Sequence, residues 1–189
     1  MSRAGYVLTG GRSSRMGRDK ALLPFRGTTL AGHVARQVSR AAGSAVFVGN
    51  PQSYEQLGFP VIPDVYPGEG PLGGILTALS HTAAEWNLIA ACDMPGISRE
   101  FLRSLLIAAK AFEADALIPV NPVSGLAEPL CAVYRREARG PIEAAFGRGV
   151  RKVIDALHSD RLRLVGIKPS VVASFQNVNT PEEWACVDL

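Results

Sequence analysis

The segment LTGGRSSRMGRDK, residues 8–20, combines glycines with fixed positive charges directly after the first apolar run of the chain. Gly10 and Gly11 lack a Cβ atom, so their backbone N–H groups can approach a ligand closely. Arg15 and Lys20 add positive charge, and successive N–H groups in such a turn form an anion-binding concavity. The segment predicts a loop that binds a compact anion; the alternative is a solvated surface loop with scattered charges.

Two familiar nucleotide-binding motifs do not fit this spacing. A dinucleotide fingerprint reads G-x-G-x-x-G, whereas the adjacent pair Gly10 and Gly11 is followed next by Gly17. A Walker A loop places four residues between its glycines and then Lys and Ser or Thr. Here five residues separate Gly11 from Gly17, and Arg18 follows. Both motifs are therefore rejected.

Two further polar residues follow apolar segments later in the chain. Asn50 ends the segment 45–50, and Asp93 ends the segment 86–93, which is the most apolar of all. In parallel α/β sheets, ligands bind outside the carboxyl ends of the strands. The sequence therefore predicts that the glycine-rich loop, Asn50 and Asp93 meet at one edge of a sheet.

Short apolar segments alternate with amphipathic ones along the chain. Strands are predicted at residues 4–8, 45–50, 59–64 (at an edge), 86–93, 114–120, 128–135, 162–167 and 171–178. Helices are predicted at residues 28–43, 72–82, 98–113, 137–147, 149–158 and 180–187. This alternation predicts one α/β domain over residues 1–189, with a largely parallel sheet and right-handed crossovers.

Composition narrows the class of protein. Hydrophobic residues make up 47% of the chain, which indicates a globular protein. The net charge of +3 is too small to indicate a nucleic-acid partner, and no apolar stretch reaches membrane-spanning length. Cys92, Cys131 and Cys186 have no short paired spacing, which fits small buried side chains in a reducing compartment. We therefore expect a cytoplasmic protein without nucleic-acid or membrane partners.

Five ordered blocks carry a resemblance that covers essentially the whole chain. They are LTGGRSSRMGRDKALLPFRGTTLAGHV, DVYPGEGPLGGI, CDMP, EPLCAVY and FQNVNTPEEW. In this order they resemble the molybdenum cofactor guanylyltransferases. The resemblance implies a three-layer α/β sandwich with a mostly parallel, mixed sheet, a Rossmann variant like the nucleotide-diphospho-sugar transferases. It also implies transfer of GMP from GTP to the terminal phosphate of molybdopterin, with Mg²⁺ and release of pyrophosphate.

Carried over by motif, a set of residues is expected to bind the guanine nucleotide. The set comprises Leu8, Thr9, Gly10, Lys20, Asn50, Asp64 and Asp93. The first three would use backbone groups, and Asp93 would also hold the metal. Arg15 and Lys20 would stabilise the α-phosphate and the leaving pyrophosphate. Simple turn roles are the alternatives for Asn50, Asp64 and Asp93.

Fewer residues of the sequence indicate where the second substrate, molybdopterin, binds. Asn177 and Asn179 alternate with Val178, so on a strand they face one side, and the resemblance implies that they face molybdopterin or the metal. For Asn179, capping of the last helix is the alternative. Handling of a labile pterin implies protein partners that supply it and apo-molybdoenzymes that receive it. Thr9 stands where alanine is usual, which adds a hydroxyl near the base, and Gly96 stands where a bulky residue is common.

The expected chemistry needs no general base. The attacking group is a phosphate monoester with a second pKa of about 6, so it is mostly dianionic at neutral pH. This fits the histidines, because His33, His81 and His158 all fall in predicted helices. Three rivals remain: a molybdopterin cytidylyltransferase, another small-molecule nucleotidyltransferase, and a non-catalytic nucleotide-binding subunit.

Overall fold

A computed structural model describes residues 2–10 and 19–168, together with residues 175, 183 and 184. Within them the strands are β1 (Arg3–Leu8), β2 (Pro24–Phe25), β3 (Thr28–Thr29), β4 (Val46–Val48), β5 (Val61–Ile62), β6 (Trp86–Ala91), β7 (Ala116–Val120), β8 (Cys131–Arg135) and β9 (Leu162–Gly166). The helices are α1 (Leu30–Ala42), α2 (Pro51–Tyr54), α3 (Pro71–His81), α4 (Arg99–Ala109) and α5 (Arg139–Gly147). None of these described helices is long and apolar enough to cross a membrane.

In the described part of the chain, seven strands form one mixed sheet in the order β5-β4-β1-β6-β8-β7-β9. β5, β4, β1 and β6 are parallel, and β8 runs antiparallel to its neighbours β6 and β7. The most apolar predicted strand, β6, is buried at all six positions in the middle of the sheet. The short strand β5 lies at the edge, as its proline-flanked sequence predicted.

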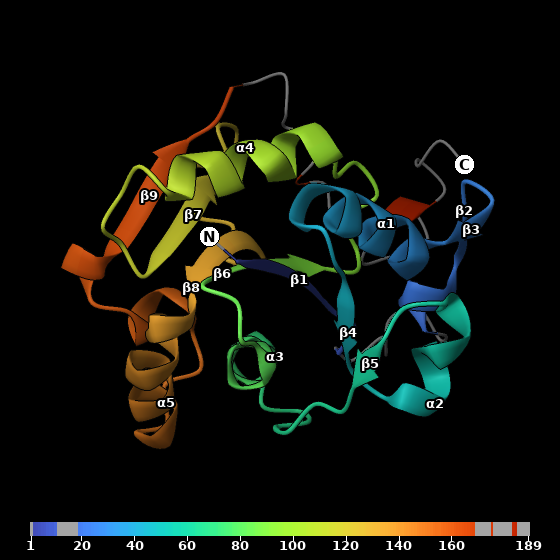
Figure 1. Cartoon of the computed structure of the whole chain (residues 1–189), viewed down its shortest axis with the longest axis horizontal. Coiled ribbons are helices and arrows are strands. Elements are labelled where there is room, and N and C mark those ends of the chain that lie inside the picture. Colours follow the sequence, from blue (N-terminus) through green and yellow to red (C-terminus); the bar gives the residue numbers. More distant parts are fainter. Residues whose placement is uncertain (1, 11–18, 169–174, 176–182, 185–189) are drawn as a thin grey trace.

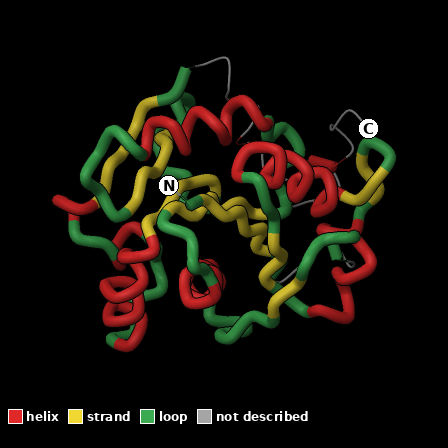
Figure 2. Tube along the Cα trace, in the orientation of Figure 1, coloured by secondary structure: helices red, strands yellow, loops and turns green. Residues whose placement is uncertain are grey.

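Helices cover both faces of the sheet (Figures 1 and 2). On one face α1 and α4 pack side by side, and residues such as Val34, Val38 and Leu102 build that core. On the other face α3 and α5 pack together, with Leu76 and Ile142 in the second core. The three-layer α/β sandwich with a mostly parallel sheet is therefore confirmed.

Local signals set the helix ends as expected. The Thr29 hydroxyl accepts a hydrogen bond from Gly32 N at 3.1 Å at the start of α1, and Gly43 ends it with φ of 93°. The Ser98 side chain likewise accepts from Phe101 N at the start of α4. These capping residues fix the direction in which each helix leaves the sheet.

Three parts differ from the sequence prediction. The predicted helix 149–158 is wrong: Gly149 takes φ of 88° after α5, and only a 3-10 turn, Ile154–Ala156, follows. His158 consequently lies outside any helix, in extended backbone before a second 3-10 turn. The β2–β3 hairpin and the short helix α2 were not predicted. The predicted strand 171–178 and helix 180–187 fall largely outside the described residues.

Candidate active site

A cleft of about 480 Å³ opens at the carboxyl ends of β1, β4 and β6. Three groups of residues line it. Leu8, Gly10 and Lys20 come from β1 and the segment after it, and Val48 comes from β4. The loop before α3 and the start of that helix contribute Asp64, Gly68, Gly70, Pro71 and Gly74. The remaining wall consists of Ala91, Cys92 and Asp93 after β6, and Leu130 before β8.

Lys20 and Asp93 meet in this cleft although 73 residues separate them in sequence. Lys20 Nζ lies 2.5 Å from Asp93 Oδ2, and the two side chains are only 17% and 13% exposed. The other carboxylate oxygen, Asp93 Oδ1, is buried and accepts no hydrogen bond from any residue that the structure describes. A buried carboxylate oxygen without a partner is costly for a fold, so this atom is available to a cation.

Cys92 precedes Asp93 in the cleft but has no nucleophilic character. Burial raises the pKa of its thiol, and the negative charge of Asp93 raises it further. A thiol must ionise before it attacks or binds a metal, so Cys92 contributes an apolar surface.

Asp64 presents one carboxylate oxygen to the protein and the other toward the cleft. Its Oδ1 accepts from Tyr66 N and from the Thr77 hydroxyl, each at 3.0 Å. Its Oδ2 lies beside the Gly10 backbone, because a Cβ placed on Gly10 would sit 3.8 Å from it. The first oxygen fixes the side chain, and the second remains for a ligand.

The turn before α3 keeps its shape through glycine and aromatic contacts. Gly68 and Gly70 take φ of 83° and 81°, which other residues rarely adopt. Tyr66 packs at a tilt against Phe146 with ring centroids 4.8 Å apart, and Arg151 Nε binds Glu69 Oε2 at 2.7 Å. These contacts anchor the cleft wall to the end of α5.

The tandem glycines of α3 serve close packing. A Cβ on Gly73 would lie 2.9 Å from Tyr66 Cβ, and one on Gly74 would lie 3.3 Å from Leu8 Cδ1. The helix therefore begins directly against the end of β1.

Two predicted residues lie outside the cleft lining. Asn50 caps α2, and its side-chain oxygen accepts from Gln52 N at 3.1 Å. The Thr9 hydroxyl is buried and donates to Val48 O at 2.9 Å, so it faces the neighbouring strand. Arg15, Asn177 and Asn179 lie outside the described residues.

The histidines take no part in the described cleft lining. His33 is buried in α1, edge-on to Phe25 at 4.8 Å, and burial lowers its pKa. His81 in α3 pairs its Nδ1 with the Tyr6 hydroxyl at 3.1 Å. Both support the sequence-based view that histidine is not the reactive group.

Comparisons with known proteins agree with this geometry. The MobA-like NTP transferase domain matches residues 5–162. The chain belongs to this family. It is 33% identical to the "Probable molybdenum cofactor guanylyltransferase" of Bacillus cereus strain G9842, over 97% of this chain and 95% of that protein. The sequence resemblance to molybdenum cofactor guanylyltransferases is thereby confirmed, and the chain is a nucleotidyltransferase.

Solved structures extend the comparison. Molybdopterin-guanine dinucleotide biosynthesis protein A from Archaeoglobus fulgidus is 29% identical, with a TM-score of 0.81, over 96% of this chain and 95% of that one. The Mycobacterium tuberculosis protein Rv0371C in complex with manganese is 19% identical, with a TM-score of 0.62, over 88% of this chain and 89% of that one. At that identity the second similarity shows the fold alone.

Two polar residues of this MobA-like chain were missed from the sequence. Tyr54 in α2 donates its hydroxyl to Asp19 Oδ2 at 2.7 Å, beside the cleft. Glu128 lies before the turn that leads into β8, where its N–H donates to Pro119 O at 2.9 Å and its carbonyl oxygen accepts from Cys131 N at 3.1 Å. Burial raises the pKa of Glu128, and the charge of Asp93 adds to this. Its place in the block EPLCAVY was the available signal for Glu128.

Proposed function

We propose that this chain transfers GMP from GTP to the terminal phosphate of molybdenum-molybdopterin and releases pyrophosphate. The product is the guanine dinucleotide form of the molybdenum cofactor. The contact between Lys20 and Asp93 carries the proposal, because it joins a cation and a metal-type carboxylate at the carboxyl ends of β1 and β6. The guanylyltransferase names of relatives at 31–33% identity favour guanine over cytosine.

The nucleotide would lie in the cleft along β1. Backbone groups of Leu8, Thr9 and Gly10 would contact the base and ribose, since glycine allows close approach. Asp64 Oδ2, beside Gly10, would accept a hydrogen bond from the ribose or the base. Asn50 would approach the nucleotide with its Nδ2 amide, because the capping bond from Gln52 N uses only Oδ1.

Mg²⁺ suits the carboxylate of Asp93. The buried Oδ1 accepts no hydrogen bond from the described residues, and Mg²⁺ prefers one or two carboxylates together with phosphate oxygens. When bound there, the ion would supply positive charge against the α-phosphate. The carboxylate is held in place by Lys20 and by its position after the buried strand β6.

Charge stabilisation by the chain's own residues is the main requirement of the transfer. A bond forms between an oxygen of the pterin phosphate and the α-phosphorus of GTP, and the bond from that phosphorus to the bridging oxygen of pyrophosphate breaks. The attacking oxygen is already ionised, so no proton has to be removed. Lys20 and Arg15 would stabilise the negative charge on the phosphates as it shifts to the leaving group.

Molybdopterin would enter on the side of Asn177 and Asn179, with proteins that supply it and apo-molybdoenzymes that accept the product. Residues 1–189 would act as one domain. The buried thiols of Cys92 and Cys131 suit a reducing, cytoplasmic setting.

A nucleotide competition assay tests the proposal. The purified chain is given molybdopterin, GTP, CTP and either MgCl₂ or a chelator, and the dinucleotide products are separated and identified. We expect the guanine dinucleotide with Mg²⁺ and no product with the chelator. Turnover with CTP but not GTP would exclude the proposed base, and nucleotide binding without any turnover would indicate the non-catalytic alternative.

A further inference from the structure

Asp19 is the acidic residue of the glycine- and arginine-rich segment 8–20, and it lies directly before Lys20. Both of its carboxylate oxygens are engaged within the chain. Oδ1 accepts from Ala21 N at 3.0 Å and caps the 3-10 turn Lys20–Leu22. Oδ2 accepts from the Tyr54 hydroxyl at 2.7 Å. Asp19 therefore acts on the backbone that carries Lys20.

Tyr54 is held rigidly enough to serve as an anchor. It is 5% exposed and packs against Phe47 with ring centroids 6.0 Å apart. A Cβ on Gly49 would lie 3.1 Å from Tyr54 Cε2, so the ring sits tightly on the backbone after β4. A side chain confined in this way loses little further entropy when its hydroxyl binds Asp19.

The hydroxyl has one proton and two acceptors within reach. Thr9 O lies 3.4 Å away, against 2.7 Å for Asp19 Oδ2, so the carboxylate receives the stronger bond. Burial and the neighbouring Asp19 raise the pKa of Tyr54, which keeps the phenol protonated and donating at every physiological pH. The contact thus connects the ends of β1 and β4 with the turn that bears Lys20.

We infer that Tyr54 is a positioning residue for Lys20, acting through Asp19 to hold the Lys20 ammonium on Asp93 in the cleft. This inference rests on the proposed function for its effect on catalysis. Its structural content, the placement of Lys20, is independent of the substrate. A displacement of about 1 Å at a reacting centre costs roughly a hundredfold in rate, so a partial loss of placement is expected to be measurable.

Tyr54→Phe removes the hydroxyl and retains the packed ring. We expect kcat to fall roughly tenfold and the GTP dissociation constant to rise several-fold, because the charge of Lys20 is no longer held at the phosphates. In the Lys20→Met background the same substitution is expected to change the GTP dissociation constant, measured by calorimetry, by less than about 1.5-fold. If Tyr54→Phe raises the GTP dissociation constant as much in the Lys20→Met background as it does with Lys20 present, Tyr54 has a general structural role and the inference is overturned.

Asp19 variants separate positioning from direct ligation. Asp19→Asn keeps an acceptor for Ala21 N and an amide that can bond with Tyr54, so near-normal GTP binding is expected. Asp19→Ala removes the bond with Tyr54 and also the cap on Ala21 N, so it is expected to lower kcat at least as much as Tyr54→Phe. If Asp19→Asn is as damaging as Asp93→Asn, Asp19 acts through its charge on metal or phosphate, and the inference is wrong.

Competitive acetylation of the ligand-free chain gives a readout without any nucleotide. Mass spectrometry compares the reaction rate of Lys20 with that of the exposed Lys110. We expect Tyr54→Phe to raise the relative rate of Lys20 several-fold, because its ammonium is no longer held on Asp93. Tyr6→Phe, which removes a hydroxyl bonded to His81, is the matched control and is expected to leave the ratio unchanged.

The outcomes keep the two proposals apart. An unchanged Lys20 rate in Tyr54→Phe would overturn the positioning role whatever the substrate. A raised rate in a chain that binds no GTP would support the positioning role and refute the proposed function.

Discussion

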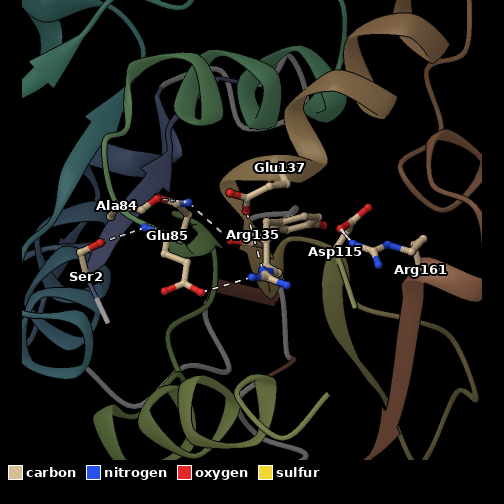
Figure 3. Close-up of polar contacts among 9 residues, drawn as sticks. Ser2, Ala84, Glu85, Asp115, Arg135, Glu137 and Arg161 are labelled. Carbon is tan, nitrogen blue, oxygen red and sulfur yellow. Dashed lines mark hydrogen bonds and ion pairs between the residues drawn. The ribbon is translucent and has the colours of Figure 1, made fainter. Parts of the chain in front are cut away.

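The two ends of the same sheet hold their charged residues in opposite ways. At the amino ends of β6 and β7, arginines pair with the carboxylates (Figure 3). Arg135 Nη2 lies 3.3 Å from Glu85 Oε1, and Arg161 Nη2 lies 2.6 Å from Asp115 Oδ1. Backbone bonds tie the same residues together, since Arg135 N donates to Asp115 O at 2.8 Å.

At the carboxyl ends of β1 and β6, some carboxylate oxygens accept no hydrogen bond from the described residues. Asp93 Oδ1 and Asp64 Oδ2 accept no hydrogen bond from the described residues, and Glu128 has the neutral amide of Asn121 at 3.3 Å. At the amino edge the carboxylates of Glu85 and Asp115 are thus paired with arginines, although Arg135 Nε is buried without a hydrogen bond from the described residues. At the cleft edge, carboxylate oxygens remain available to a ligand. The difference predicts that substitutions at the cleft change activity and that those at the opposite edge change stability.

The largest expected effect is that of Asp93→Asn. It keeps the shape of the side chain and removes the charge on the buried oxygen, so product formation should fall roughly a thousandfold. The melting temperature should also fall, because the ion pair between Oδ2 and Lys20 Nζ is lost, so turnover is measured per folded molecule. Asp115→Asn is the matched control at the opposite edge: it weakens the bond to Arg161, so the melting temperature should fall while turnover persists. Normal turnover in Asp93→Asn would contradict the comparison.

Gly49→Ala is expected to damage both stability and activity. The added Cβ would lie 2.0 Å from Thr9 Oγ1, so the end of β1 must move, at a cost of about 1–3 kcal/mol. Adding Thr9→Ala removes that hydroxyl and should restore most of the loss. Chemical denaturation and GTP turnover of the two single variants and the double variant form the test. Strict additivity of the two substitutions would show that they do not share this contact.

Arg135→Ala tests the edge of the sheet opposite the cleft. The guanidinium lies 5.1 Å from the centroid of the Trp86 ring and is 28% exposed, beside two glutamates. Loss of the ring contact and the ion pairs should cost about 2 kcal/mol, or a fall in melting temperature of about 4–8 °C. Turnover per folded molecule should stay unchanged. A tenfold loss of turnover without loss of stability would place function at this edge as well.

The parts of the fold that follow hydrophobic periodicity could be predicted from the sequence. β1 and β6 are apolar runs that end in Leu8 and Ala91, and their parallel pairing puts Gly10 and Asp93 at one edge. The direct contact between Lys20 and Asp93 could not be predicted, because a tertiary ion pair across 73 residues leaves no local signature.

Other secondary-structure elements were not predicted correctly, because their sequence patterns are weak or misleading. The β2–β3 hairpin turns through Arg26 and Gly27 with φ of 45° and 73°, and arginine is rarely found in that region. α2 has only four residues, too few for a helical period, so Tyr54 had no pattern to reveal it. Val150, Val153 and Leu157 have helical spacing, but Gly149 at φ of 88° starts an irregular segment.

The smallest expected effect concerns Glu128, the carboxylate before β8 whose charge interacts with that of Asp93. Burial raises its pKa above the ordinary value of 4.5, and the charge of Asp93 adds to this, although the bond from Asn121 opposes it. A raised pKa means that the folded state holds the proton more tightly than the unfolded state does. The stabilisation from this proton is complete below pH 4.5 and is lost as the pH rises through the folded-state pKa.

Glu128→Gln should therefore raise the melting temperature at pH 7 and have almost no effect at pH 4. The glutamine oxygen can still accept from Asn121, so the change removes mainly the charge. In the Asp93→Asn background the gain at pH 7 should shrink, since one repelling charge is already gone. Glu85→Gln at the opposite edge should lower the melting temperature at pH 7, because that glutamate pairs with Arg135. If both substitutions change the melting temperature at pH 7 in the same direction, the two edges treat their carboxylates alike. The contrast between the two ends of the sheet would then be refuted.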